Sequence, residues 1–194
     1  MSKRNKINSV SYVARARFLA FGGHRLFDFC NTIIRHGKRD EDRLPEPSEA
    51  QRFLRQTYNQ TVKLSESEFR ELIALRAHLR EFFRNVIEGH DLRPSKFMLW
   101  LQKHPFMIDP LIGFEKIPLR VSLKRDRFIE LILMDLIEVM SSHDKKRIKR
   151  CGNPNCSHFF YDSTKPNSRN WCSMKSCGNI MKARAFYERK KLLT

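Results

Sequence analysis

Four cysteines near the C-terminal end of the sequence constrain the fold more than any other feature. They form two Cys-x4-Cys pairs, Cys151–Cys156 and Cys172–Cys177, which are separated by a short loop. Two such pairs can approach one ion from tight turns, and four thiolates complete the tetrahedral shell that Zn²⁺ prefers. Two disulfides are the alternative, but nothing ahead of the pairs resembles a secretory signal, so we expect reduced thiols. The spacing therefore predicts a segment folded around one structural zinc ion.

A shell of four sulfurs also argues against catalysis at this site. Hydrolytic zinc keeps an open position for water, whereas four cysteines fill every position. His143 and His158 flank the first pair, and we expect them to belong to the surface or to the small core because the cysteine set is complete. The fifth cysteine, Cys30, lies in the apolar stretch 26–34 and is interpreted as a buried, inert thiol.

The charge of the chain indicates a polyanionic partner. The 194 residues include 38 Lys+Arg and 21 Asp+Glu, which gives a net charge of +17 and a pI near 10.1. Residues 145–194 carry 13 basic and 2 acidic side chains, so this segment contributes +11 of that charge. A four-cysteine zinc site itself carries about −2, and some of the cations can serve only to offset it. The remainder exceeds what solvation requires and predicts binding to phosphates.

The N-terminal segment differs in composition from the rest of the chain. Residues 1–23 contain Lys and Arg but no Asp or Glu. They faintly resemble a mitochondrial presequence, and they equally suit a disordered basic arm, which is our expectation for a cytoplasmic protein. No stretch of the sequence approaches the roughly 20 apolar residues of a membrane helix, so no membrane partner is expected.

Residues 24–143 predict a helical domain. Its clearest element runs from Ser65 to Glu88, where Ser65 and Glu68 have the spacing of a capping box and apolar residues recur at three- and four-residue steps. Gly89 is expected to end this helix. The other expected elements are a helix over 26–37, a helix from an N-cap at Ser48 to Tyr58, a brief helix over 95–103, a small β-hairpin within 111–123 and a buried helix over 127–142.

Three polar residues of this domain are candidates for a ligand site. Arg76 and Arg80 lie one turn apart beside the apolar stripe of the long helix, and Asn31 follows Cys30. The two arginines are interpreted either as ordinary solvated residues or as an anion site between helices. A small molecule or a protein is therefore a candidate partner of this domain. We expect no enzyme, because the sequence contains no paired carboxylates, phosphate-binding glycine loop or nucleophile motif.

Residues 144–194 predict a small zinc module with short β elements and a terminal helix that begins near Asn179. No flexible linker precedes the module, so we expect it to be carried rigidly on the last core helix. We expect Cys172→Ser to unfold the module and to leave the helices largely intact. The aromatic residues are expected to pack around the metal, with stacking on bases as the alternative: Phe159, Phe160, Tyr161 and Trp171. The candidates for nucleic-acid contacts are Lys149, Arg150, Arg169, Lys175, Lys182, Arg184, Arg189 and Lys190.

The terminal helix divides its cations between two faces. With 3.6 residues per turn, Lys182 and Arg189 share one side, and Arg184 lies almost opposite. One face at most can enter a groove, and the other would reach flanking phosphates or water. Arg169, which precedes the second cysteine pair, has a second interpretation as the partner of Asp162.

The residues from Cys151 to Arg189 resemble the CGNR zinc finger family. Upstream, the sequences LFDFCNT at 26–32 and LSESEFRELIALRAHLR at 64–80 are similar to the helical ABATE domain. One residue departs from the family pattern, because the arginine that completes CGNR is Ile180 here. The resemblance in the finger is carried by the first cysteine pair, Phe160–Thr164, Arg169, Trp171–Met174, Cys177–Asn179, Lys182, Tyr187 and Arg189.

This resemblance implies a zinc-dependent, DNA-binding transcription regulator of the bacterial cytoplasm that responds to stress. Zinc binding should be retained because all four thiols are present. Any contact with a phosphate or base that the family arginine makes is lost here, unless Lys175 or Lys182 makes it instead. An RNA-binding or ribosome-associated module is the alternative, with the same cations and with Phe159, Tyr161 or Trp171 stacked on unpaired bases. The sequence specifies neither the oligomeric state nor the bound sequence.

Overall fold

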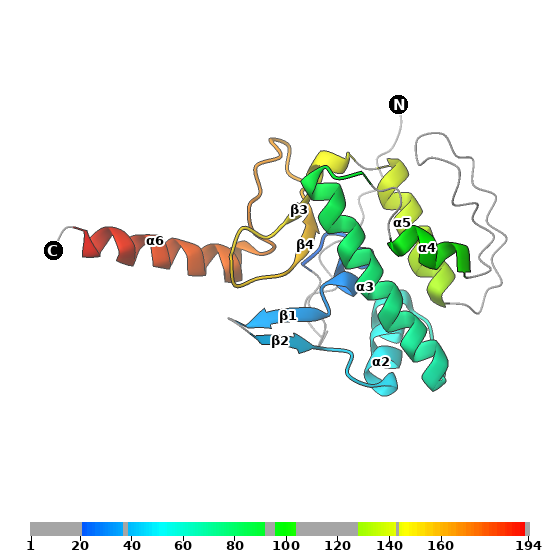
Figure 1. The fold of residues 1–194 in the computed structure, drawn as a ribbon. Coiled ribbons are helices and arrows are strands. Elements are labelled where there is room, and N and C mark those ends of the chain that lie inside the picture. The colour runs from blue at the N-terminus through cyan, green and yellow to red at the C-terminus, as the bar shows by residue number, and fades with distance from the viewer. Residues whose placement is uncertain (1–20, 37–38, 92–95, 104–127, 143, 193–194) are drawn as a thin grey trace, which may run out of the picture.

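A short, buried helix forms the centre of the fold. The computed structural model describes residues 21–36, 39–91, 96–103, 128–142 and 144–192, which are drawn in Figure 1. Helix α1 (Arg25–Cys30) begins after His24, whose Nδ1 accepts a hydrogen bond from the backbone N–H of Leu26 at 3.2 Å. Its side chains Leu26, Phe27, Phe29 and Cys30 are fully buried. The helix ends at Asn31, so the expected continuation to residue 37 is wrong.

Helix α3 (Glu66–Glu88) is the longest described element and packs against α1, and against α2 and α4, which are defined below. The predicted capping box is present. The backbone N–H of Ser65 donates to Glu68 Oε2 at 2.8 Å, and the backbone N–H of Glu68 donates to Ser65 Oγ at 3.3 Å. Gly89 ends the helix in the left-handed conformation, with φ 72°. Its buried apolar stripe consists of Leu72, Leu75, Leu79, Phe82 and Phe83.

The described residues of the helical part form three further helices, all expected from the sequence: α2 (Pro47–Tyr58), α4 (Lys96–Lys103) and α5 (Phe128–Ser142). The expected N-cap of α2 at Ser48 is wrong, because the helix is preceded by Glu46 and starts at Pro47. Proline suits the first helical turn, where its missing N–H costs no hydrogen bond. The hairpin expected within 111–123 lies outside the described residues. Among the residues described, no helix is long and apolar enough to span a membrane.

A buried ion pair fixes α5 against α1. Asp135 of α5 is 1% exposed, and it accepts hydrogen bonds from Arg25 Nε and Nη2 at 2.6–2.9 Å. The Arg25 guanidinium also lies over the ring of Tyr58 at the end of α2, 4.9 Å from the ring centroid. A buried carboxylate needs a charged partner. The pair therefore orients three helices around one contact.

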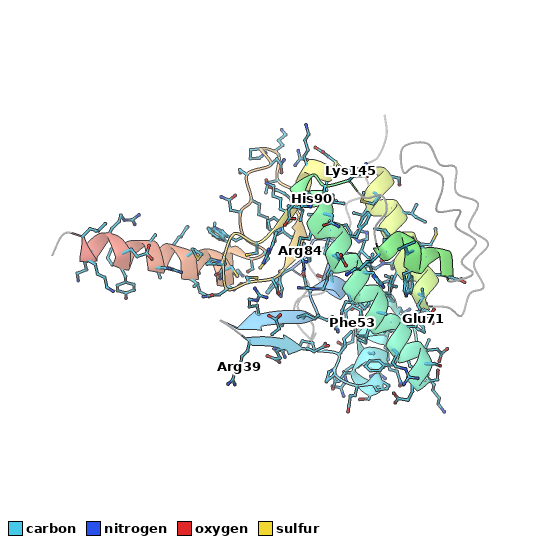
Figure 2. The ribbon with its side chains drawn as sticks, in the orientation of Figure 1. Arg39, Phe53, Glu71, Arg84, His90 and Lys145 are labelled. Carbon is cyan, nitrogen blue, oxygen red and sulfur yellow. The ribbon has the colours of Figure 1, made fainter. Side chains whose placement is uncertain are left out.

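A two-stranded hairpin replaces the second half of the expected first helix. Strands β1 (Ile33–His36) and β2 (Arg39–Asp42) pair antiparallel, with Ile33 opposite Asp42. Arg76 of α3 holds the base of this hairpin by donating to both carboxylate oxygens of Asp42, at 2.7 and 2.6 Å. Figure 2 shows Arg39 at its free end. The partner of Asp42 lies 34 residues away in the sequence, which is why local periodicity could not indicate the hairpin.

The C-terminal part contains short strands and a terminal helix, so the predicted mainly α fold class is confirmed. A 3-10 turn, η1 (Lys145–Arg147), leads into strand β3 (Ile148–Arg150), which pairs antiparallel with β4 (Phe159–Tyr161). A turn of π-helix, η2 (Met174–Gly178), continues directly into α6 (Asn179–Lys191). Figure 1 shows that α6 extends away from the rest of the molecule.

The C-terminal module predicted over residues 144–194, called the finger below, shares one hydrophobic core with the helical part. Ile148 of β3 and Phe159 of β4 belong to the same buried cluster as the helices. The ring of Phe83 contacts those of Phe27 and Phe159, with centroid separations of 4.9 Å and 6.3 Å. The finger is thus attached through α1 and α3, and the core continues across the boundary expected at residue 143.

The last residues of the expected N-terminal arm also lie against the finger. The backbone N–H of Tyr161 donates to the carbonyl of Gly22 at 2.8 Å, and Phe21 packs against the cluster of cysteines. Residues 1–20 lie outside the described part of the chain. The arm predicted over 1–23 therefore ends in an ordered segment, Phe21–Gly23.

Candidate metal centre and nucleic-acid interface

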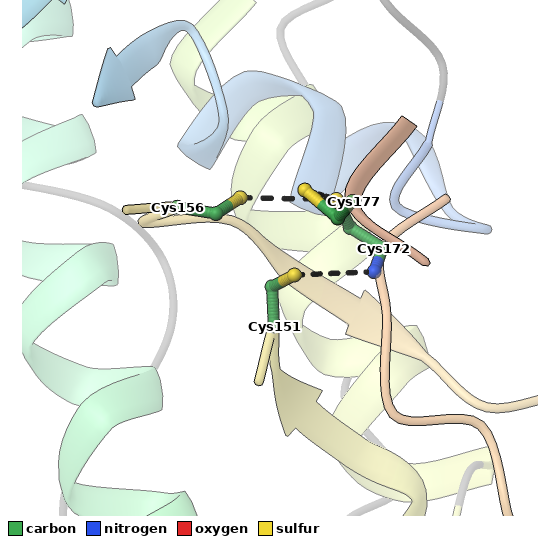
Figure 3. Close-up of side chains that lie close together, drawn as sticks. All are labelled: Cys151, Cys156, Cys172 and Cys177. Carbon is green, nitrogen blue, oxygen red and sulfur yellow. Dashed lines mark hydrogen bonds between the residues drawn. The ribbon is translucent and has the colours of Figure 1, made fainter. Parts of the chain in front are cut away.

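The four predicted zinc ligands converge on one point, as Figure 3 shows. The Sγ atoms of Cys151, Cys156, Cys172 and Cys177 all lie within 4.8 Å of one another, and the four residues are buried. Cys172 Sγ lies 3.8 Å from Cys156 Sγ and 3.7 Å from Cys177 Sγ. A tetrahedral Zn²⁺ with bonds of about 2.3 Å requires sulfur–sulfur separations of about 3.8 Å. The donor set therefore fits a zinc ion in both chemistry and spacing.

Two local turns bring the cysteines to this point. In the first, the backbone N–H of Cys156 donates to the carbonyl of Asn153 at 2.9 Å, and that of Cys151 donates to the carbonyl of His158 at 2.9 Å. In the second, Ser173 Oγ caps η2 by accepting from the N–H of Ser176 at 3.3 Å. These hydrogen bonds order the backbone of both turns, so ordered segments hold the sulfur atoms in place.

Trp171 packs between the two turns. A Cβ atom added to Gly152 would lie 3.0 Å from Trp171 Cζ3, and one added to Gly178 would lie 3.1 Å from its Cδ1 and 2.4 Å from Met174 Sδ. Both glycines therefore allow the backbone to approach the Trp171 ring closely. This supports the packing interpretation of Trp171, because its ring is already covered by backbone on two sides.

The electrostatics of the cluster favour a bound cation. The N–H of Cys172 approaches Cys151 Sγ at 3.5 Å, and Asn153 Nδ2 approaches Cys177 Sγ at 3.5 Å. Hydrogen bonds from the Cys156 and Cys172 thiols lower the pKa of Cys151, and sharing a proton with Cys151 raises the pKa of Cys156. Four crowded thiolates cannot all form without a compensating charge. A bound zinc ion would supply that charge and release the remaining protons.

Asp162 organises the loop between the cysteine pairs. It is fully buried and accepts from Lys149 Nζ at 2.7 Å, from the N–H and hydroxyl of Thr164 at 2.9 and 2.6 Å, and from the N–H of Arg169 at 2.7 Å. Burial opposes ionisation, but these donors hold the pKa of Asp162 well below its usual value. Lys149 Nζ also donates to the carbonyl of Asn167 at 2.7 Å. Lys149 therefore has a structural role in addition to its predicted contact with nucleic acid.

Arg169 also makes its contacts within the protein. Its Nε donates to the carbonyl of Trp171 at 2.8 Å, and its Nη2 donates to the carbonyls of Phe21, at 3.1 Å, and of Cys172. The guanidinium lies over the ring of Phe160, 4.5 Å from its centroid. Burial lowers the pKa of Arg169. Sequence reasoning suggested an ion pair with Asp162, whereas it is the backbone N–H of Arg169 that binds that carboxylate.

The other predicted nucleic-acid residues lie at the surface, and most of them belong to α6. No residue of α6 is buried, and Ile180, which replaces the family arginine, is 57% exposed in its first turn. Arg184 Nε donates to Glu188 Oε1 at 2.8 Å across one helical turn. The exposed candidate cations are Arg150, Lys175, Lys182, Arg184, Arg189 and Lys190.

The three candidate ligand residues of the helical domain connect parts of the protein to one another. Asn31 clamps β4 of the finger: its Nδ2 donates to the carbonyl of Phe159 at 2.8 Å, and its Oδ1 accepts from the N–H of Phe159 at 2.8 Å. Arg76 is paired with Asp42, as described above. Arg80 donates to the carbonyl of Cys30 and lies over the Phe159 ring, 5.5 Å from its centroid. These contacts replace the interpretation of the arginines as solvated residues.

Cys30 is the inert thiol that the sequence suggests. Its side chain is fully buried, and burial raises its pKa to about 12, so the thiolate is strongly disfavoured. Sequence reasoning did not identify the segment Phe21–Gly23 as part of the finger. The paired glycines after a basic stretch were the available signal, since Gly22 and Gly23 permit a close backbone approach.

Comparison with known families agrees with this geometry. Residues 147–190 match the family model for the CGNR zinc finger. Residues 23–98 match the model for the ABATE domain, described as "Putative stress-induced transcription regulator". The chain thus contains a CGNR zinc finger, preceded by an ABATE domain. A search of curated proteins found no match.

The family assignment confirms the resemblance that the sequence motifs indicated. The match to the CGNR zinc finger begins at the end of η1, includes all four cysteines and reaches Lys190 in α6, and the match to the ABATE domain runs from α1 into the first turn of α4. Helix α5 lies between the two matched ranges, yet it contributes Ile132, Leu133 and Leu136 to the shared core. The two matched domains thus form one packed unit and depend on the same buried residues.

Proposed function

We propose that this protein is a cytoplasmic transcription regulator that binds DNA through its zinc-ordered C-terminal helix. The observation that carries the proposal is that α6 leaves the zinc centre without burying any residue. A helix of this length is only marginally stable alone in water. Its position and its exposed surface are therefore explained best by a partner that covers it.

The charge of α6 favours a polyanion as that partner. The helix carries the cations Lys182, Arg184, Arg189, Lys190 and Lys191 against one acidic residue, Glu188. A second copy of this helix would be repelled by the same charges, whereas DNA would release counterions as its phosphates are neutralised. A helix that leaves a zinc centre is also a common way to enter the major groove.

Two matched double variants distinguish the faces of α6. Lys182 and Arg189 share one face, and Arg184 and Lys191 share the other. One double variant is Lys182→Gln with Arg189→Gln, and the other is Arg184→Gln with Lys191→Gln. We expect one of the two to remove most of the sequence-specific affinity. The other should mainly lower the salt dependence of binding. Both variants remove two charges from the same exposed helix, so each serves as the control for the other.

The binding experiment starts with selection of bound sequences from random DNA by the zinc-loaded full chain, beside an equal RNA pool. Fluorescence anisotropy of the selected duplex across a salt series should then give a linear dependence of log Kd on log salt, with a sequence preference that survives competitor DNA. Absence of binding at low salt, or equal losses from the two double variants with no sequence preference, would contradict DNA recognition by α6.

RNA remains the second candidate because α6 also exposes aromatic rings. Phe186 and Tyr187 are 56% and 64% exposed, and aromatic side chains among cations can stack on unpaired bases. Phe159, by contrast, is 2% exposed within the core, so its predicted stacking role is wrong. Enrichment of single-stranded RNA in the selection, with a large loss of affinity for Tyr187→Ala, would favour this alternative.

The ABATE domain is the part that we propose receives a signal or a partner. Asn31 and Arg80 join its helices α1 and α3 to Phe159, so any displacement of α1 changes the position of the finger. A bound molecule or protein that moves α1 would therefore alter DNA affinity through this contact. We propose no enzymatic activity for either domain.

A further inference from the structure

Ile180 is a large apolar side chain at the exposed start of α6. It is the second residue of the helix and lies three positions after the cysteine Cys177, and its side chain is 57% exposed. Removal of apolar surface from water is favourable, so a partner that covers α6 would gain affinity by burying this side chain. Ile180 is therefore a candidate contact residue that carries no charge.

The cysteine cluster fixes the position of Ile180. Turn η2 carries Cys177 and continues into α6 without a break. The side chain of Asn179 joins the two elements, because its Nδ2 donates to the carbonyl of Lys175 at 3.3 Å. The first turn of α6 thus begins on an ordered support, and Ile180 points from a defined place on the finger.

Three other exposed side chains share the side of α6 on which Ile180 lies. With 100° per residue, they all lie within about 40° of Ile180 around the helix axis. Lys182 and Arg189 lie on the opposite side. The set, called the Ile180 face below, consists of Ile180, Arg184, Tyr187 and Lys191.

The Ile180 face has the order of side chains that suits a groove of DNA. Recognition helices contact base edges mainly through their N-terminal residues, and Ile180 is in the first turn. Arg184, one turn further along, and Lys191, near the end of the helix, supply the positive charge that complements phosphates. The face thus combines an apolar contact at its start with cations along its length.

The chemistry of Ile180 favours this face over the opposite one. Its side chain has no donor for a phosphate, so it would stay in water if the side with Lys182 and Arg189 entered the groove. In the major groove, thymine is the base that presents a methyl group. Other base edges present donors or acceptors, and isoleucine would remove water from them without replacing the lost hydrogen bonds.

We propose that the Ile180 face enters the major groove and that Ile180 contacts the methyl group of a thymine, which makes T·A the preferred base pair at that position. This inference rests on the proposed function and names a residue that determines its specificity. It also distinguishes the two double variants described above. Arg184→Gln with Lys191→Gln should cause the greater loss of sequence-specific affinity.

The test measures recognition of single methyl groups by the zinc-loaded full chain. Each thymine of the selected duplex is replaced in turn by uracil, which lacks only the methyl group, and binding is followed by fluorescence anisotropy. Loss of one buried methyl group corresponds to about a fourfold decrease in affinity. We expect this decrease at one thymine of the site. Replacement of that thymine by 5-bromouracil, whose bromine is similar in size to a methyl group, should preserve the affinity.

Two variants assign the effect to Ile180. Ile180→Ala should bind the thymine and uracil duplexes equally at that position, because the side chain that contacts the methyl group is absent. Leu192→Ala is the matched control. Leu192 is 86% exposed at the end of the same helix, and it lies about 120° from Ile180 around the axis. This control should keep the fourfold difference, and neither substitution opens a cavity in the core.

A third variant changes the base that is read. Arginine can donate two hydrogen bonds to O6 and N7 of guanine. Selection of bound sequences with Ile180→Arg should therefore replace T·A by G·C at this position and leave the other positions unchanged. A selected sequence identical to that of the wild type would contradict a base contact by residue 180.

The outcomes separate the two proposals. A thymine preference that Ile180→Ala abolishes and Leu192→Ala retains supports the role of Ile180. Equal discrimination of thymine from uracil by the wild type and Ile180→Ala, or a greater loss from the double variant of Lys182 and Arg189, would overturn that role and leave the proposed function intact. Absence of sequence-specific DNA binding by the wild-type chain would refute both.

Discussion

Asn31 is the residue at which the connection between the two domains can be tested most sharply. Its amide makes two hydrogen bonds of 2.8 Å with the backbone of Phe159, one in each direction, and Asn31 is 4% exposed. The amide thus takes the place of a neighbouring strand along one residue of β4. Asn31→Ala removes both bonds and leaves a buried N–H and a buried carbonyl without this partner.

The expected loss of stability follows from those two groups. A buried polar group that loses its hydrogen-bond partner costs about 1–3 kcal/mol. The two groups are adjacent, so one local shift of the backbone can offset part of the cost of both. We therefore expect a decrease of about 3 kcal/mol in the free energy of unfolding. With a urea dependence of about 2 kcal/mol/M for a chain of this size, the unfolding midpoint should fall by about 1.5 M.

The assay needs one probe in each domain. Far-UV circular dichroism follows the helices, and fluorescence follows the finger in a Trp100→Phe background, where Trp171 is the only tryptophan. Because Phe159 belongs to the core of the helical part, both probes should shift together. The control in the same interface is Ser157→Ala, which removes a single 3.2 Å bond to the carbonyl of Ile33 and should cost about 1 kcal/mol or less.

Two results would refute this reasoning. If Asn31→Ala lowers stability no more than Ser157→Ala, then the double hydrogen bond does not connect the domains. If the Trp171 signal shifts while the helical signal is unchanged, then the finger unfolds separately, and the shared core contributes little to cooperativity.

Three further predictions concern the metal ligands, a loop carboxylate and a titrating group. Cys172→Ser should abolish stoichiometric zinc binding and also lower the urea midpoint of helix unfolding, because β3 and β4 contribute to the core of the helices. If the helices unfold at the wild-type midpoint, the finger folds independently of them. Asp162→Asn should weaken the loop by about 2–3 kcal/mol and speed zinc transfer to a colorimetric chelator, since the ammonium of Lys149 loses its charged partner; unchanged transfer kinetics would count against this role. Removal from water raises the pKa of Asp28 from 3.8 to about 7, so the folded state holds the extra proton between these values and stability falls as the pH rises from about 4 to 7. Asp28→Asn should therefore be more stable than wild type at pH 8, by about 4 kcal/mol in the free energy of unfolding, with little difference at pH 4. Equal melting curves at pH 8 would argue against the raised pKa.

Local signals in the sequence predicted the elements that depend on local contacts. Ser65, Glu68 and Gly89 indicated both ends of α3 because a capping box and a left-handed glycine act within one turn. The zinc ligands were predictable for a related reason, since each cysteine pair lies within one short turn and the chemistry of four thiolates is specific.

Contacts between distant residues explain what the sequence could not indicate. Ile33 and Ile34 have helical spacing after Leu26, yet they form a strand that pairs with β2, and Asp42, opposite Ile33 at the base of the hairpin, is held by Arg76. Asn31 was interpreted as part of a ligand site because its partner, Phe159, lies 128 residues away. A buried polar side chain looks the same in a sequence whether it binds a ligand or another part of its own chain.

The position of Phe159 has a consequence for engineering. Modular fingers can be cut out and joined in new combinations because each one carries its own interior. Here the finger contributes an aromatic ring to its neighbour and receives an amide clamp from it. Cutting the chain after residue 143 would expose apolar side chains on both fragments. A change of the bound sequence would therefore require substitutions in α6 of the intact protein rather than transfer of the isolated finger.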